Sequence, residues 1–241
     1  FNSNLAEVIQ DPDLTTGARF TDNSKFYHLD YNYNFGHMWD WAEVQVGGSA
    51  RRDSLNSSGT IFTDVDGPIE YQETGFYTQA VKKMMDERLV VTAAMRYDKS
   101  ELFDGQFSPR AVLSYTAGEY KNHNFRVSYQ TGFRTPTTQD LFIGLDAGQA
   151  SLVGSGDGNP ARFVRDYGVS VAGQALGIPA SVTLSGDAAY NNAYEASSVQ
   201  AFAATGNPAL LNVADVDYVK PEQMQSMEFG YRGKLSRTFT I

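Results

Sequence analysis

The segment from Asn124 to Pro136, NFRVSYQTGFRTP, alternates between two kinds of residue with a period of two. One set contains Phe125, Val127, Tyr129, Thr131 and Phe133, and the other contains Arg126, Ser128, Gln130, Gly132 and Arg134. Successive residues of a strand point to opposite sides of a sheet, so the pattern predicts a strand with one apolar, aromatic face and one polar face. Such a strand fits a soluble sheet with a buried face or a barrel with that face in lipid, and the segment alone leaves both open.

Six further segments have a strand pattern, at residues 25–35, 41–47, 70–84, 88–99, 108–116 and 222–232. In 70–84 the pattern does not decide which residues share a face, and 238–241 is expected to begin an eighth strand. The predicted connections alternate in length. Short ones lie near 36–40, 84–87, 117–123 and 233–237, and longer ones lie near 51–69, 101–107 and 135–221. This rhythm is typical of an up-and-down outer-membrane barrel, although a soluble up-and-down barrel also fits it.

Composition excludes several classes of protein. No window approaches the roughly 18 to 20 uninterrupted apolar residues of a spanning helix, whereas 15 Phe, 14 Tyr and 2 Trp suit a β core or interfacial girdles. The net charge of −9 argues against a nucleic-acid partner. Cysteine is absent, no Gly-x-Ser-x-Gly motif occurs, and His28, His37 and His123 lack metal-ligand spacing. We therefore expect no enzyme activity, no metal site and no cofactor.

The segment 135–221 is too long for a plain connection. We expect a flexible Gly-rich stretch at 154–160, a weak helix at 162–176 and a helix at 191–205 that is capped by Asn192 and Glu195 and stopped by Gly206. The segment carries eight acidic and three basic residues, which disfavours a strongly anionic ligand. Its Asp157-Gly-Asn159 and the earlier Asp64-Val-Asp66 offer oxygen ligands for calcium, but polar turns explain both better.

Three segments carry a resemblance to a known family. Residues 73–98 contain Gly-x-Tyr-x-Gln and end in Arg-Tyr-Asp, residues 107–136 run from Ser-Pro-Arg to Phe-Arg-Thr-Pro, and residues 219–233 contain Lys-Pro-Glu. In this order the three resemble barrel strands of TonB-dependent outer-membrane receptors, most closely those of the Bacteroidota type. Together they span a bit under a third of the chain and frame nearly all of it.

The resemblance implies an all-β fold, a transmembrane antiparallel up-and-down β-barrel of 22 strands with long extracellular loops, filled by a plug. The sequence shows only about seven to eight such strands, and no plug, TonB box or closing C-terminal strand. We therefore interpret residues 1–241 as part of one receptor barrel domain: strands and loops at 25–134, a long extracellular loop at 135–221 and strands at 222–241. An isolated arc of this size would expose two unpaired edges, which favours a larger receptor.

A set of charged residues falls on the expected lumen-facing side of the strands: Arg96, Asp98, Arg110, Arg126, Arg134, Glu228 and Arg232. Facing hydrocarbon, an arginine near the midplane would cost about 2–4 kcal/mol. These residues either form structural ion pairs that brace the barrel against the plug or contact the ligand, and both roles remain open. Phe133, Arg134 and Pro136 form a loop-exit motif where a strand passes into the long loop. Trp39 and Trp41 lie at a short turn, which suits the headgroup level of a membrane.

The leading hypothesis is TonB-driven uptake of a nutrient (glycan, peptide, siderophore or metal chelate) across the bacterial outer membrane. The expected partners are outer-membrane lipid, TonB acting through the plug, and a lid lipoprotein or a larger membrane assembly. Two alternatives stay open: a structural or scaffold barrel in a larger assembly, and a soluble β-rich glycan-binding module.

Overall fold

The computed structural model describes residues 20–146 and 151–234, and these form two compact units. The strand unit comprises Lys25–Ser54, Glu70–Thr135 and Lys220–Ile241. The loop unit comprises Phe1–Ser24, Leu55–Ile69 and Pro136–Val219. Each unit therefore draws on segments that lie far apart in the sequence.

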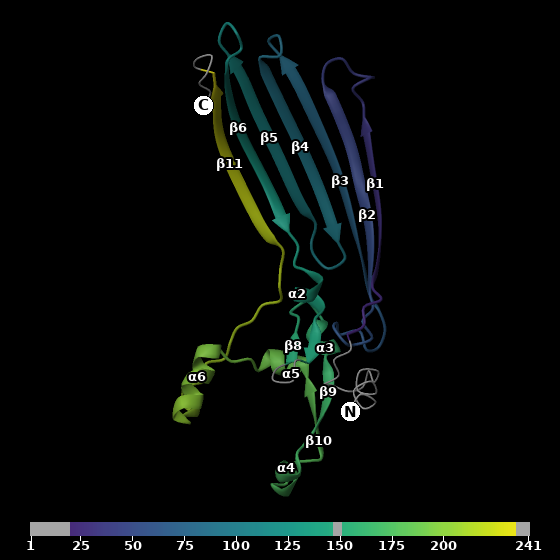
Figure 1. The fold of residues 1–241 in the computed structure, drawn as a ribbon, viewed down its shortest axis with the longest axis vertical. Coiled ribbons are helices and arrows are strands. Elements are labelled where there is room, and N and C mark those ends of the chain that lie inside the picture. Colours follow the sequence, from purple (N-terminus) through teal and green to yellow (C-terminus); the bar gives the residue numbers. More distant parts are fainter. Residues whose placement is uncertain (1–19, 147–150, 235–241) are drawn as a thin grey trace, which may run out of the picture. The chain divides into compact units, whose positions relative to one another are not determined.

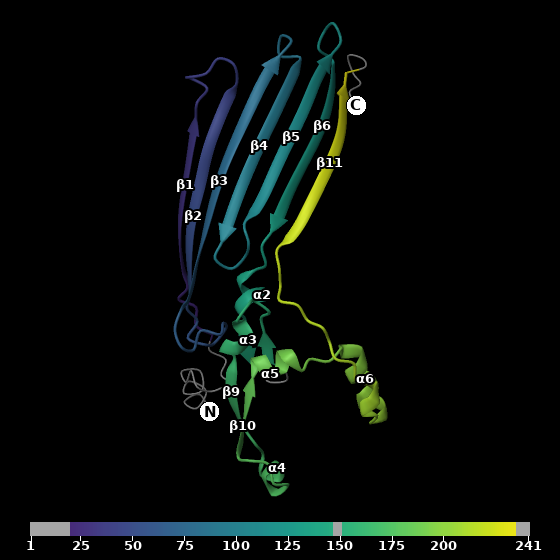
Figure 2. The same ribbon diagram turned by 180° about the vertical axis from the view of Figure 1, so that it is seen from behind.

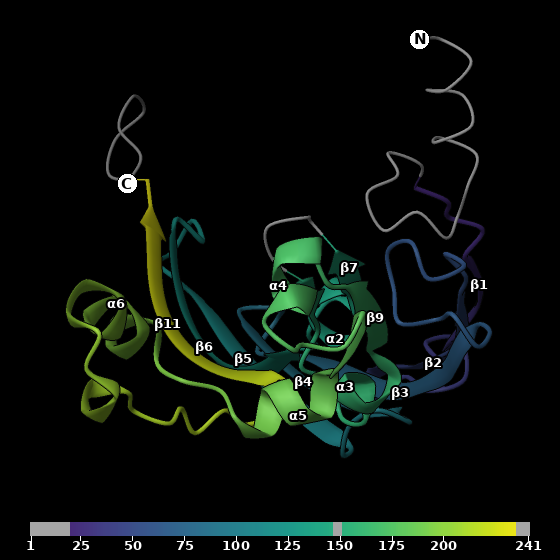
Figure 3. The ribbon, with the colours of Figure 1, turned by 90° about the horizontal axis from the view of Figure 1, so that it is seen from below.

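The strand unit is one seven-stranded antiparallel sheet, in which the strands follow the order β1-β2-β3-β4-β5-β6-β11 (Figures 1 and 2). Its strands are β1 (Lys25–Asn34), β2 (Glu43–Leu55), β3 (Ile69–Met84), β4 (Leu89–Ser100), β5 (Gln106–Ala117), β6 (His123–Arg134) and β11 (Glu222–Gly233). Each strand pairs with its neighbour in the sequence, except that β11 joins β6 after the long connection. Seen along the strands, the sheet follows an arc (Figure 3).

One face of this sheet is apolar and open to the surroundings. Tyr27 and Leu29 of β1 are 65% and 66% exposed, and Phe229 of β11 is 74% exposed. The buried apolar residues of the strand unit are few, since most buried hydrophobic side chains belong to the loop unit. A soluble protein rarely leaves an apolar surface of this extent in water. The sheet therefore has the surface of a membrane wall rather than that of one layer of a soluble core.

An aromatic cluster occupies the turn between β1 and β2. The rings of Phe35 and Trp39 stack with centroids 5.0 Å apart, and those of Trp39 and Trp41 lie 6.4 Å apart. The ammonium group of Lys82 lies over the Trp41 ring, 5.4 Å from its centroid. Large amphipathic rings at the end of a strand pair suit a membrane–water boundary.

The strand prediction for 41–47 is too short, because β2 continues to Leu55. In the sequence, Gly47 reads as a residue that ends the strand. In the structure, a Cβ at this position would come within 2.5 Å of the Tyr77 ring. The glycine therefore makes room for a tyrosine of the next strand and does not end its own strand. The connection between β4 and β5 is also shorter than expected, at residues 101–105. The predicted strand start at 238–241 lies outside the described residues.

The loop unit is built of short elements. They are α2 (Thr138–Phe142), β7 (Gly144–Asp146), β8 (Ser151–Val153), α3 (Asn159–Arg162), β9 (Val164–Gly168), α4 (Val171–Ala175), β10 (Ser181–Ser185), α5 (Gly186–Asn191), α6 (Ala196–Thr205) and a 3-10 turn (Pro208–Leu210). Two small hairpins, β7–β8 and β9–β10, are antiparallel, and α4 lies at the tip of the second (Figure 1). The helix expected at 162–176 is confirmed only for Val171–Ala175, which form α4. Residues 164–168 are instead extended, because β9 pairs with β10.

The stretch 154–160, which we expected to be flexible, lies in the core of the loop unit. A Cβ on Gly154 or on Gly156 would come within 2.7 Å of the backbone of Leu141. Asn159 and Pro160 are among the most deeply buried side chains of the described chain. Glycine occurs here because two backbone segments approach too closely for a side chain, so the expectation of flexibility was wrong.

The helix expected at 191–205 begins later, at Ala196, while Gly206 ends it as predicted with a φ of 69°. Residues 193–195 are held extended by pairing with 212–214: Glu195 donates its N–H to the Asn212 carbonyl, and Ala214 donates to that of Ala193. The Asn192 side chain donates to the carbonyl of Ala188 instead of capping a helix. Among the described residues, none of the helices has the length and apolar character needed to cross a membrane.

Candidate functional site

The strand register places all seven of the predicted charged residues on one face of the sheet. Direct cross-strand partners share a face, and the partners Arg96–Ser108, Arg110–Gln130 and Ser128–Glu228 connect β4, β5, β6 and β11. The remaining four residues, Asp98, Arg126, Arg134 and Arg232, lie an even number of positions away on the same strands. We call this side of the sheet the polar face.

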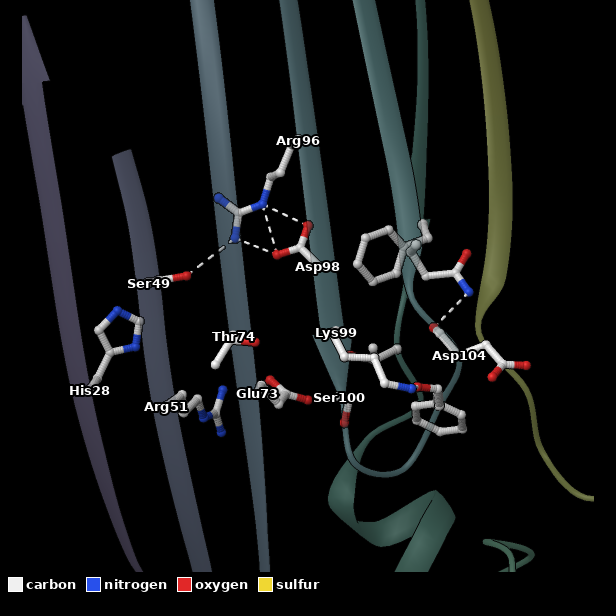
Figure 4. Close-up of a pocket in the computed structure, with 14 residues that line it drawn as sticks. His28, Ser49, Arg51, Glu73, Thr74, Arg96, Asp98, Lys99, Ser100 and Asp104 are labelled. Atoms are coloured by element: carbon white, nitrogen blue, oxygen red, sulfur yellow. Dashed lines mark hydrogen bonds and ion pairs between the residues drawn. The ribbon is translucent and has the colours of Figure 1, made fainter. Parts of the chain in front are cut away.

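The polar face carries two arginine–aspartate pairs with the same spacing. Arg96 donates from Nε to both carboxylate oxygens of Asp98, at 2.9 and 2.7 Å, and from Nη2 to Oδ1 at 2.6 Å. Its Nη2 also lies 3.4 Å from the Ser49 hydroxyl (Figure 4). On β2, Arg51 donates to Asp53 at 2.7 Å, and Asp53 is 4% exposed. Hydrogen bonds to an ionised group are the strong ones, so these pairs hold the side chains in place.

These pairs lie at a cavity of about 220 Å³ that is contained within the strand unit (Figure 4). Besides Arg96 and Asp98, its lining includes His28, Ser49, Arg51, Glu73, Lys99 and Phe133. The Lys99 ammonium donates to the Phe103 carbonyl at 2.8 Å, and His28 is paired with Asp30. The volume is below the about 300–1,000 Å³ of a drug-sized site, so the cavity suits one small group of a larger ligand.

Gly75 provides the space for the Arg96–Asp98 pair. A Cβ at this position would lie 2.5 Å from Asp98 Oδ1 and 2.7 Å from Arg96 Nη2. A side chain there would force the pair apart or bend the strand.

We expect Gly75→Val to lower the free energy of unfolding of the protein by about 1–3 kcal/mol, the usual cost of overpacking. Gly132→Val is the matched control, because Gly132 is also on the polar face and its nearest neighbour, the Met224 terminal carbon, is 4.0 Å away. Thermal unfolding of both variants in detergent measures the difference. Equal midpoints would show that the Arg96–Asp98 pair does not depend on the space at Gly75.

The loop-exit residues lie where β6 leaves the sheet. β6 ends at Arg134, whose Nε is 3.9 Å from the Glu222 carboxylate on β11. Phe133 lines the cavity, and Pro136 is the first residue of the following part of the loop unit. The chain then enters α2, where Thr137 and Asp140 form a reciprocal capping box.

Most of the cavity residues were not predicted from sequence, among them His28, Ser49, Arg51 and Glu73. The expected strand 41–47 ended too early to include Ser49 and Arg51, and the faces of β3 were unresolved. The repeated Arg-x-Asp spacing at 51–53 and 96–98 is a signal that could have revealed them, because it places two residues on the same side of a strand. No cluster of three or more potential metal-ligating side chains occurs within residues 20–146 and 151–234.

An antiparallel sheet with one open apolar face and one ion-paired face is typical of one class of protein, the transmembrane β-barrels. The sequence matches the family described as TonB dependent receptor-like, beta-barrel, over residues 2–241. The chain therefore belongs to this family and forms a seven-stranded part of such a barrel. No curated protein matches the chain.

Three solved structures are similar to the chain at low sequence identity. The siderophore receptor PirA from Pseudomonas aeruginosa is 13% identical with a TM-score of 0.51, and the match covers 91% of this chain and 31% of that one. PirA from Acinetobacter baumannii is 12% identical with a TM-score of 0.46, covering 88% and 24%. The ferric enterobactin receptor PfeA in complex with BCV-L6 is 13% identical with a TM-score of 0.46, covering 88% and 25%. The chain thus spans less than a third of each structure.

Proposed function

We propose that this chain is one arc of a receptor that imports a nutrient across the bacterial outer membrane, driven by TonB. The observation that carries the proposal is the two-sided sheet: its apolar face suits lipid, and its polar face suits the water-filled or plugged interior of a barrel. In this orientation the seven predicted residues line the lumen. The receptor does no covalent chemistry, and its work is recognition and transport.

The arrangement supports structural bracing for some lumen residues and ligand contact for others. Arg96 is held by Asp98, so its first role is to brace the wall. The cavity beside it combines hydroxyl, carboxylate and aromatic groups, which suits a small polar part of a ligand. Among glycans, peptides, siderophores and metal chelates, the acidic composition of 135–221 disfavours multiply anionic chelates.

The proposal includes the partners that such a receptor requires. TonB would act through a plug, outer-membrane lipid would surround the apolar face, and a lid lipoprotein would suit a receptor of the Bacteroidota type. A scaffold barrel without transport is the competing function, and the same experiment distinguishes the two.

The test is uptake by cells that produce the full-length receptor. Cells would be offered a neutral oligosaccharide, an oligopeptide or a ferric chelate, each with a radioactive label. We expect accumulation of one class, and its loss when TonB is deleted or the proton gradient is dissipated. Uptake that continues without TonB would indicate a passive barrel. No uptake of any class, from a receptor correctly assembled in the outer membrane, would favour the scaffold function.

A further inference from the structure

One lysine lies on the apolar face at the end of the sheet that carries the short turns. Lys82 of β3 is opposite Val91 of β4, and the partner of Val91 on β5 is Leu113, which is on the apolar face. Lys82 is two positions from the end of β3 at Met84, next to the short β3–β4 turn (Figure 1). The other Asp, Glu, Lys and Arg residues that the described strands place on this face lie near the opposite ends of their strands: Lys25, Arg52, Glu70 and Lys99.

The charge of Lys82 has no acidic partner in the described chain. At the far end of the sheet, Arg52 and Glu70 neutralise each other at 2.7 Å. Lys82 is exposed and forms no ion pair and no hydrogen bond with residues 20–146 or 151–234. Asp40 and Glu43, the acidic residues on either side of the start of β2, do not pair with it. The apolar face therefore carries one uncompensated cation at its short-turn end.

The tryptophans beside Lys82 add two unused hydrogen-bond donors. The ammonium group of Lys82 lies 5.4 Å from the centroid of the Trp41 ring, and the Trp39 ring lies 6.4 Å from that of Trp41. Trp39 and Trp41 are 40% and 61% exposed, and neither indole N–H has an acceptor among the described residues. An indole N–H can only donate. We call Trp39, Trp41 and Lys82 the donor cluster.

We propose that the donor cluster binds the phosphate group of a membrane phospholipid. The cluster combines a cation with two neutral donors and no acceptor, so an anion that accepts several hydrogen bonds complements it. Lipid phosphates meet this requirement and lie at the boundary where tryptophan rings and lysine ammonium groups are favoured. The adjoining apolar face, with Leu113 45% exposed, can contact acyl chains, which a free phosphate lacks. The proposal rests on the proposed function, in which this face meets lipid.

The test measures lipid binding to the full-length protein, purified in detergent and freed of lipid. The protein would be titrated with phosphatidylglycerol or with diacylglycerol of the same acyl chains, and native mass spectrometry would count the bound molecules. We expect phosphatidylglycerol to bind at concentrations at which diacylglycerol, which has no phosphate, does not.

Variants then locate the site. Lys82→Gln should lower the affinity for phosphatidylglycerol by about tenfold or more, because hydrogen bonds to charged groups are strong, whereas Lys82→Arg should retain most of it. Trp41→Phe keeps an aromatic ring but removes the N–H, so it should lower the affinity by about threefold. Lys83→Gln is the matched control, because Lys83 is the adjacent residue on the opposite face and lies 3.4 Å from the Glu87 carboxylate. It should leave the affinity unchanged.

The outcomes separate this inference from the proposed function. Unchanged binding of phosphatidylglycerol by the Lys82→Gln variant would overturn the site and leave the membrane orientation of the sheet standing. Equal binding of phosphatidylglycerol and diacylglycerol would also overturn it, since apolar contact alone would then hold the lipid. A full-length protein that stays in solution without detergent and binds neither lipid would overturn the proposed function, and the donor cluster with it.

Discussion

Replacing Leu113 by arginine should prevent assembly of the receptor in the outer membrane, whereas the same replacement of its neighbour Val112 should be tolerated. Leu113 is near the middle of β5 on the apolar face, opposite Val91 and Val127, and is 45% exposed. In the proposed orientation its side chain faces hydrocarbon. An arginine at this depth costs about 2–4 kcal/mol, a large part of the stability of most proteins.

Val112 is the control because it differs from Leu113 in the face it occupies and in little else. Its partners on the adjacent strands are Thr92 and Ser128, which are polar. An arginine there would join the existing arginines of the polar face and stay hydrated. The measurement is the amount of folded, heat-modifiable receptor in outer-membrane fractions of cells producing each variant. A smaller amount of the Val112 variant than of the Leu113 variant would show that the apolar face lines the interior. Equal amounts of the two would argue against a membrane location.

The seven-stranded sheet could be predicted from sequence because most of its strands alternate apolar and polar residues, although the alternation leaves the faces of β3 undecided and covers only the first half of β2. Arg96, Asp98, Arg110, Arg126, Arg134, Glu228 and Arg232 are placed on one face by the same alternation, and the register agrees. Their position in a lumen stays a prediction. The alternation fails at Gly47, where the glycine makes room for the Tyr77 ring of the neighbouring strand. The second half of β2, with its cavity residues, was therefore not predicted.

The loop unit was far less predictable, because its structure depends on contacts between distant segments. Thr63 and Asn159 are hydrogen-bonded although 96 positions separate them, and no local pattern indicates this. The Gly-rich stretch at 154–160 has the composition of a flexible linker, yet its glycines allow close contact with the backbone of Leu141. The polar turns at Asp64 and Asn159 were expected, but not their burial. The local sequence can indicate a turn or a helix, whereas contacts between distant segments determine whether that segment is ordered.

These distant contacts make the loop unit a single cooperative structure in our interpretation. The side chain of Asn159 is fully buried, donates to the carbonyls of Gly154 and Ile143 at 2.8 and 3.4 Å, and accepts from the Thr63 hydroxyl. The backbone reinforces the link, since Thr63 donates to the Phe142 carbonyl at 3.0 Å and Gly144 donates to that of Ile61 at 2.9 Å. The connection between β2 and β3 is thus fastened to the connection between β6 and β11.

Asn159→Ala should therefore loosen both connections together. The change removes three hydrogen bonds and leaves buried partners unsatisfied, each at about 1 kcal/mol or more, so the loop unit should lose about 2–4 kcal/mol. Hydrogen exchange with mass spectrometry on the full receptor measures this directly, because local opening free energies set the exchange rates. Peptides from 56–68 and from 138–160 should both exchange about tenfold faster or more, while strand peptides stay protected.

Asn191→Ala is the matched control, because Asn191 lies in the same unit and is exposed. It should leave exchange unchanged in both connections. Faster exchange confined to the residues around position 159 would show that the two connections open independently. If instead they open together, then one small set of buried polar contacts governs the mobility of both connections. A ligand that ordered either loop would then also order the other, because the two loops share one opening free energy.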